Sequence, residues 1–156
     1  GFVIPSGPLR ESFSSIKRAN CIFINGDKNS EFEKKIKEVN ASVKIFYSRY
    51  KIKNLEKFQN NTVIAFAGIG NPENFFDLLK RNNINVKKTF SFSDHYNYSD
   101  NDLDEIISSE ENFIYLTTEK DYFRLNDKMK KKIGYIEVSL EIENKDEFEN
   151  FLKSYL

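Results

Sequence analysis

The 156-residue chain has one cysteine, one histidine, one methionine and no tryptophan. A single cysteine excludes a disulfide within the chain and suits a reducing compartment. Cys21 lies in an apolar run, where we expect a buried strand thiol rather than a nucleophile. No second histidine or cysteine stands at metal-ligand spacing, so the sequence favours no metal site. No apolar run approaches the roughly 18 residues that span a bilayer, so we expect any membrane contact to be peripheral or made by residues outside this sequence.

Net charge is also lacking, because 24 Lys and Arg residues balance 24 Asp and Glu residues. Without a net positive field, nucleic acid is not an expected partner. The length suits about one compact domain, with a core that needs neither a disulfide nor a metal. The chain starts with Gly1 rather than methionine, which indicates a piece of a longer protein, although an expression scar or a processed terminus would also explain Gly1.

Hydrophobic patterns of strand and helix type alternate along most of the chain. Strands are predicted at residues 21–25, 42–50, 62–67, 86–92, 112–117 and 135–140, and helices at residues 30–39, 72–81, after Ser99, at 120–131 and after Asn144. Helix starts are signalled by Asn71 with Pro72, Ser99 with Asp102, and Asn144 with Glu147. Because a helical crossover returns the chain in the same direction, we predict an α/β fold: a three-layer sandwich with a mostly parallel, Rossmann-like sheet.

Functional residues of such folds gather at the carboxyl ends of the strands. Three predicted loops lie there, at residues 68–72, 93–98 and 117–121. The first carries two glycines before a helix start, whose unpaired amides attract anions. However, Glu73 replaces the third glycine of a dinucleotide fingerprint, and a Gly-Lys-Ser/Thr ending is missing, so this loop alone is a weak functional signal.

The second loop holds His95, the sole histidine, in Ser93-Asp94-His95-Tyr96. Imidazole carries protons readily near neutral pH, and adjacent carboxylates tune it. A loop histidine that caps a backbone group, or is only solvated, fits the same residues. The sequence therefore leaves a proton carrier and a structural histidine both open.

Two further polar clusters also allow two interpretations each. Residues 117–121, Thr-Thr-Glu-Lys-Asp, hold phosphate through Lys120 and the hydroxyls, or cap a helix, which is the more common use of such residues. The turn at residues 5–11, Pro-Ser-Gly-Pro-Leu-Arg-Glu, presents Arg10 and Glu11. Arginine grips phosphate and glutamate holds magnesium-bound water or a sugar hydroxyl, whereas the plain alternative is a surface turn with an ordinary ion pair.

Four motifs stand in one order: Pro5-Ser6-Gly7-Pro8-Leu9-Arg10-Glu11; Ala65-Phe66-Ala67-Gly68-Ile69-Gly70-Asn71-Pro72 with Phe75-Phe76; Asp94-His95 with Tyr98; and Thr117-Thr118-Glu119-Lys120-Asp121. Together they resemble the tetraacyldisaccharide 4'-kinase family, the lipid A 4'-kinases of Gram-negative bacteria. The resemblance extends to about Leu125 and departs from the family pattern at Ser6 and at residues 122–124.

The resemblance implies a kinase that transfers the γ-phosphate of ATP to the 4'-hydroxyl of tetraacyldisaccharide 1-phosphate, a lipid A disaccharide. It places the enzyme peripherally on the cytoplasmic face of the inner membrane. Family members hold ATP and Mg²⁺ mainly through an N-terminal domain with a phosphate-binding loop. We therefore expect no cofactor or metal ligand in this fragment, and no activity from it alone.

By the same resemblance, His95 is catalytic and pairs with an aspartate of the N-terminal domain, which draws the proton from the sugar hydroxyl. Glu11 is the second catalytic candidate and Arg10 a substrate-binding one. Asp94 and Lys120 are supporting residues. The glycines of residues 68–70 then form a strand-to-helix turn rather than a phosphate cradle.

The resemblance also divides the chain into the end of the N-terminal kinase domain (residues 1–40), an inter-domain strand linker (41–61) and a C-terminal α/β domain (62–156). A different class of protein fits the same loops. It is a free-standing, non-catalytic α/β module that binds an anionic ligand at the helix start of residues 68–72.

Overall fold

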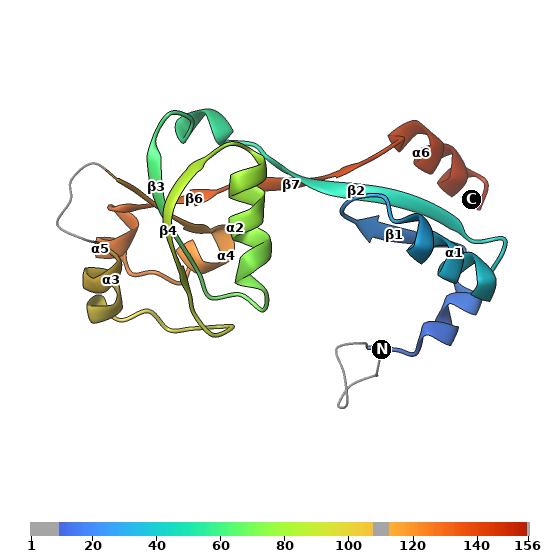
Figure 1. Cartoon of the computed structure of the whole chain (residues 1–156), viewed down its shortest axis with the longest axis horizontal. Helices are drawn as coiled ribbons and strands as arrows, with labels where there is room; N and C mark the ends of the chain where they lie inside the picture. The colour runs from blue at the N-terminus through green and yellow to red at the C-terminus, as the bar shows by residue number, and fades with distance from the viewer. Residues whose placement is uncertain (1–9, 108–112, 156) are drawn as a thin grey trace. The chain divides into compact units, whose positions relative to one another are not determined.

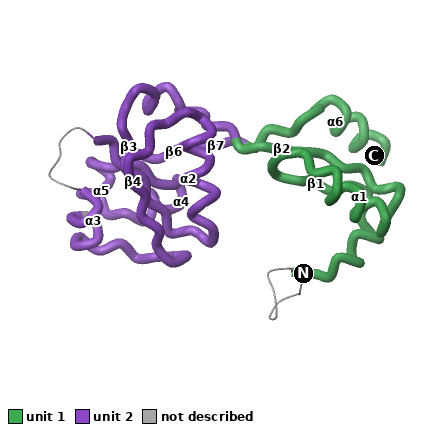
Figure 2. Tube along the Cα trace, viewed as in Figure 1, with its two compact units in different colours: residues 1–50, 140–156 green, residues 51–139 purple. Residues whose placement is uncertain are grey.

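The computed structural model describes residues 10–107 and 113–155 of the chain. It divides them into two compact units, with boundaries at residues 50/51 and 139/140 (Figure 2). One unit contains residues up to 50 and from 140 onward, and the other contains residues 51–139. Residues 5–9 of the first motif lie outside the described residues.

The unit of residues 51–139 is built on a four-stranded sheet with strand order β4-β3-β5-β6. Figure 1 labels β3, β4 and β6 of this sheet. Its strands are β3 (Thr62–Ala67), β4 (Asn85–Ser91), β5 (Ile114–Thr118) and β6 (Ile133–Ile136). All three pairings are parallel. The predicted α/β fold with a parallel sheet is confirmed.

Helices cover both faces of this sheet, and the side chains of β3 are therefore buried on both sides. Val63, Ala65 and Ala67 pack in one cluster with Phe76 and Leu79 of α2 (Pro72–Arg81). The alternate residues of β3 pack in a second cluster with Ile106 of α3 (Asp100–Ile106) and Met129 of α5 (Asp127–Lys130). The strand periodicity of two thus produces three layers.

The other unit has a three-stranded sheet of order β1-β2-β7, formed by β1 (Cys21–Asn25), β2 (Lys44–Ile52) and β7 (Val138–Ile142). Its helices are η1 (Phe13–Arg18), α1 (Ser30–Val39) and α6 (Lys145–Lys153). Phe148 of α6 packs edge-on to Phe23 and Phe46, with ring centroids 4.8 and 5.2 Å away. Aromatic contacts therefore join the last helix to β1 and β2.

Cys21 of β1 is half-buried rather than fully buried.

Two predicted elements are each divided in the structure. The predicted helix 120–131 is α4 (Glu119–Tyr122) and α5, because Asn126 starts a new helix by accepting a hydrogen bond from the Met129 amide at 3.0 Å. The predicted strand 135–140 is β6 and β7, which belong to different sheets. Glu137 lies between them, and its backbone bonds to Lys53 and Asn54 instead, at 2.8 and 3.0 Å.

The predicted helix caps have mixed outcomes. Ser99 and Asp102 form the expected reciprocal capping box, with amide-to-side-chain distances of 2.7 and 3.3 Å. In the described chain, neither Asn71 nor Asn144 accepts a capping bond, and Asn144 has a left-handed φ of 54°. The side-chain cap predicted for Asn144 is therefore wrong, because this backbone conformation differs from that of an N-cap residue.

The compact units are not the domains predicted from the resemblance. Residues 140–156 belong with the first 50 residues, whereas the predicted C-terminal domain includes them. A compact unit is defined by contacts within one chain. A family domain is defined by a segment that recurs among related proteins. The predicted limits at residues 40 and 61 remain a prediction.

Phe76 of α2 is 1 % exposed. The substitution Phe76→Ala is expected to lower the free energy of unfolding by about 3–5 kcal/mol. The loss combines the burial of the ring with the cavity left behind. Urea unfolding followed by circular dichroism measures it. Phe123→Ala removes the same atoms at a side chain that is 64 % exposed and should cost far less. Equal losses in the two variants would contradict the assigned core.

Candidate active site

Three loops meet at the carboxyl end of the parallel sheet. β4 and β5 flank β3 on its two sides, so the loops that follow Ala67, Ser91 and Thr118 leave the sheet at the same edge. The Phe92 amide donates to the Ala67 carbonyl at 2.9 Å, which extends the β3–β4 pairing into the loops. The sequence-predicted site loops are therefore neighbours in this unit.

Asp121 ties two of these loops together. Its side chain is 0 % exposed, and its Oδ2 accepts hydrogen bonds from the Gly68 amide at 2.9 Å and the Thr118 hydroxyl at 2.8 Å. Its Oδ1 lies 3.4 Å from Nη1 of Arg124. A buried carboxylate needs such donors, since leaving it unpaired costs several kcal/mol. Asp121 thus fixes the start of α4 against the turn after β3.

The loop of residues 93–98, called the histidine loop below, packs onto this turn at Gly68. A Cβ at Gly68 would lie 2.7 Å from the Tyr98 hydroxyl and 3.2 Å from the Ser93 carbonyl, so a larger residue would displace the loop. The Tyr98 hydroxyl is buried and has no hydrogen-bond partner among the described residues. Burial, and then the charge of Asp121, raise the pKa of Tyr98 and keep it a neutral phenol. Here the glycine serves close packing.

The backbone of His95 is held in an uncommon conformation. Its φ of 60° lies in the left-handed region. Its amide donates to the Gly68 carbonyl at 3.1 Å and to Oδ1 of Asp94 at 3.0 Å. Tyr96 closes the turn with an amide bond of 3.1 Å to the Ser93 carbonyl. These bonds fix the main chain of His95 beneath an imidazole that is 70 % exposed.

Asp94, His95 and Lys120 form one surface cluster. Nζ of Lys120 lies 3.3 Å from Oδ1 of Asp94 and 3.4 Å from Nε2 of His95. Oδ2 of Asp94 lies 3.9 Å from the same Nε2. Partial desolvation raises the pKa of Asp94, but the hydrogen bond and charge of Lys120, with His95, outweigh it and hold the pKa below its ordinary value. A carboxylate, an ammonium and an imidazole therefore lie next to one another on this surface.

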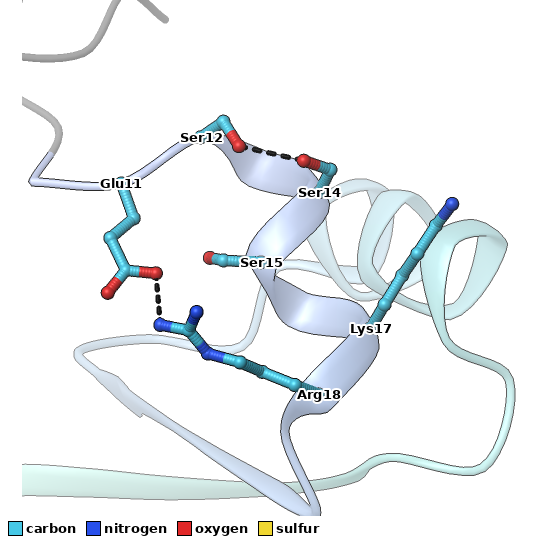
Figure 3. A pocket seen from close by; sticks show the side chains of 6 residues that line it. All are labelled: Glu11, Ser12, Ser14, Ser15, Lys17 and Arg18. Atoms are coloured by element: carbon cyan, nitrogen blue, oxygen red, sulfur yellow. Dashed lines mark hydrogen bonds and ion pairs between the residues drawn. The ribbon is translucent and has the colours of Figure 1, made fainter.

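Glu11 and Arg10 belong to the other unit, so the structure does not join them to this cluster. Both are exposed, and the Glu11 carboxylate pairs with Arg18 at the end of η1 (Figure 3). Glu11 borders a shallow hollow of about 480 Å³, whose other lining residues are Ser12, Ser14, Ser15, Lys17 and Arg18. The ion pair of Glu11 is therefore with Arg18 rather than with its neighbour Arg10.

Thr118 behaves as the capping prediction requires. Its hydroxyl accepts the Asp121 amide at 3.1 Å and starts α4. Thr117 points into the core instead and donates to the Phe66 carbonyl at 2.8 Å.

Sequence reasoning missed Asp121 and Tyr98 as organisers of the site. For Asp121, the Thr-x-x-Asp spacing of a capping box was the available signal, although it does not reveal the bond to Gly68.

In the two described stretches, 10–107 and 113–155, no three His, Cys, Asp or Glu side chains are grouped so that they could hold a metal ion. Within the same stretches, no helix combines the length and the apolar character needed to cross a membrane.

The structure is that of an α/β protein in which Asp94, His95 and Lys120 meet on loops at the carboxyl ends of parallel strands, where such folds bind their ligands. The chain belongs to the tetraacyldisaccharide-1-P 4'-kinase family, which matches it over residues 1–156. The predicted family is confirmed.

Relatives named tetraacyldisaccharide 4'-kinase include one from Pelagibacter ubique, 36 % identical over 97 % of this chain and 50 % of its own length. Another, from Rickettsia akari, is 37 % identical over 94 % of this chain and 45 % of its own length. The crystal structure of LpxK from Aquifex aeolicus in complex with ATP has a TM-score of 0.60 and 26 % identity, covering 97 % of this chain and 47 % of that one. The chain spans about half the length of the relatives it matches.

Removal of the buried carboxylate in Asp121→Ala is expected to lower the free energy of unfolding by about 3–5 kcal/mol, because Arg124, Thr118 and the Gly68 amide lose their partner. Chemical unfolding checks the value. Asp104→Ala, at an exposed position of α3, is the matched control and should cost well under half as much. A loss at Asp121 no larger than at Asp104 would refute its tying role.

The Asp94 carboxyl is expected to titrate below the ordinary aspartate range, and its pKa should rise in Lys120→Met. Because the folded-state pKa is lowered, Asp94 contributes stability above its unfolded pKa and loses it as the pH falls through the folded value. Carbon-detected NMR of the side-chain carboxyl follows both titrations. An unchanged Asp94 midpoint in the variant would show that Lys120 is not the dominant partner.

Proposed function

We propose that the chain is part of a kinase that transfers the γ-phosphate of ATP to the 4'-hydroxyl of tetraacyldisaccharide 1-phosphate in lipid A biosynthesis. The observation that carries the proposal is the family match over the whole chain. It is supported by a histidine that sits, with a carboxylate and a lysine, at the carboxyl end of the parallel sheet.

His95 is the proposed catalytic histidine, one half of an acid–base pair in which an aspartate is the base. A sugar hydroxyl is a poor nucleophile, and a positioned acid–base pair supplies roughly 10²- to 10⁴-fold in rate. The backbone bonds of His95 hold its position, and its 70 % exposure leaves the imidazole accessible to a partner and a substrate. In the proposed relay, an aspartate of the N-terminal domain takes the hydroxyl proton while His95 orients that aspartate.

Glu11 and Arg10 are also proposed as site residues, as the family resemblance implies. Arg10 exposes a guanidinium, which suits bidentate contact with a phosphate group of the substrate. Glu11 exposes a carboxylate beside serine hydroxyls and Arg18 (Figure 3). A carboxylate next to hydroxyl groups suits the hydrogen bonding of a sugar, so Glu11 is the proposed second catalytic residue.

ATP and Mg²⁺ are assigned elsewhere in this proposal. The sequence has no Gly-Lys-Ser/Thr ending, and the described residues offer no cluster of metal ligands. We therefore assign both groups to the portion of the relatives that this chain does not span. The ATP complex of the Aquifex aeolicus relative supports ATP as the phosphate donor.

The acceptor is a lipid, so we also propose that the enzyme works peripherally at the cytoplasmic face of the inner membrane. A lipid A disaccharide carries its acyl chains in the bilayer and its 4'-hydroxyl at the surface. A peripheral enzyme can reach that hydroxyl without spanning the membrane.

The alternative, a non-catalytic module that binds an anion at residues 68–72, is less well supported. The Gly68 amide is already bonded to Asp121. The Asp94 carboxylate also lies close to this turn, since a Cβ at Gly70 would be 3.8 Å from its Oδ2. Both features oppose binding of an external anion there. Calorimetric titration of this chain with inorganic phosphate tests the alternative.

The kinase proposal predicts a specific defect in a full-length enzyme that contains this chain. His95→Ala should lower turnover by about 10²- to 10⁴-fold and leave the KM for ATP nearly unchanged. Transfer of labelled phosphate to the disaccharide measures both parameters. Asn97→Ala, at an exposed position of the same loop, is the control and should retain turnover. Near-normal turnover of His95→Ala would refute the relay.

A further inference from the structure

We infer that Lys120 is a positioning residue that holds His95 as its Nδ1–H tautomer, with Nε2 as a hydrogen-bond acceptor. The inference rests on the proposed function only for its consequence in catalysis. The tautomer itself follows from the contacts of the cluster.

The chemistry of the two side chains fixes the direction of their contact. A lysine ammonium carries three donors and no acceptor. Nζ of Lys120 lies 3.4 Å from Nε2 of His95, within hydrogen-bonding distance. Nε2 must therefore act as the acceptor, and the ring proton of the neutral imidazole lies on Nδ1.

Asp94 is the competing influence, because a carboxylate near Nε2 favours a proton there. Its Oδ2 lies 3.9 Å from Nε2, which is beyond a hydrogen bond. Its Oδ1 is bonded instead to Lys120 at 3.3 Å and to the His95 amide at 3.0 Å. The carboxylate thus anchors the ammonium in front of the ring, and Lys120 makes the closer contact with Nε2.

The positions of both partners depend on the same buried carboxylate. Lys120 lies in α4 between Thr118, which caps the helix, and Asp121, which is buried. His95 is bonded through its amide to Gly68, whose own amide is bonded to Asp121. Hydrogen bonds at the bases of the two loops therefore place the backbones of Lys120 and His95 near each other, and the side chains, 49 % and 70 % exposed, meet above them.

This arrangement assigns separate tasks to the two ring nitrogens. Nε2 is occupied by Lys120, so Nδ1–H is the donor left for another group. In the proposed relay, the aspartate of the N-terminal domain would accept from Nδ1–H. A histidine in the other tautomer would present a lone pair to that carboxylate, and the contact would be lost.

The test uses NMR of the chain itself, in which the only histidine gives one unambiguous set of ring signals. Long-range ¹H–¹⁵N correlation above the ring's titration distinguishes the two tautomers by the shifts of Nδ1 and Nε2. The wild-type chain should show mainly Nδ1–H. Lys120→Met should reverse the ratio toward Nε2–H, which free histidine prefers, and Lys120→Arg should retain the wild-type pattern because it keeps a cationic donor.

Lys128→Met is the matched control, since it removes the same charge from an exposed position of α5, and it should leave the tautomer unchanged. A wild-type ring that is mainly Nε2–H would overturn the inference even if Lys120→Met failed to fold. So would a folded Lys120→Met chain, with wild-type amide signals elsewhere, that kept the Nδ1–H form. The readout needs no catalysis, so it is independent of the kinase test at His95. In the full-length enzyme, Lys120→Met should lower kcat by at least 10-fold with little change in the KM for ATP.

Discussion

The candidate site depends on one buried charge, the carboxylate of Asp121. It accepts from the Gly68 amide and the Thr118 hydroxyl and lies beside Arg124, so it joins the turn after β3 to the start of α4. The histidine loop then rests on that turn through the Gly68 carbonyl. A buried carboxylate stabilises a fold only when its hydrogen-bond donors are in place. The donors of Asp121 come from two of the loops, and the third loop is bonded to one of these, so the three loops are held together.

The sequence predicts the α/β layers well because their signals are local. β3 and α2 have the predicted bounds, since a run of buried apolar residues and a proline at the helix start are visible without tertiary contacts. The predicted strand across residues 135–140 fails for the opposite reason. Asn54, more than 80 residues away, bonds to the backbone of Glu137 and separates β6 from β7. No local pattern contains that information.

The same distinction applies to the site. The motifs identify Asp94, His95 and Lys120 by residue type, and the topology explains their meeting, because neighbouring parallel strands end at one edge. The contact of Lys120 with Nε2 could not be predicted, since it depends on the φ of 60° at His95 and on the bond of that residue to Gly68. The partner of Glu11, Arg18, was missed because it is brought near by η1 rather than by a motif.

The glycine turn shows how one feature can signal anion binding and yet serve another role. Free amides after a strand attract negative charge, and in this protein the Gly68 amide does bind an anion, the internal carboxylate of Asp121. Because this carboxylate belongs to the chain itself, the hydrogen bond that it accepts from the turn requires no bound ligand. The side chain of His95 is largely exposed, so its position depends on the backbone beneath it, which is bonded to this turn. The turn thus binds an internal anion through the Gly68 amide and holds the backbone of His95 through the Gly68 carbonyl.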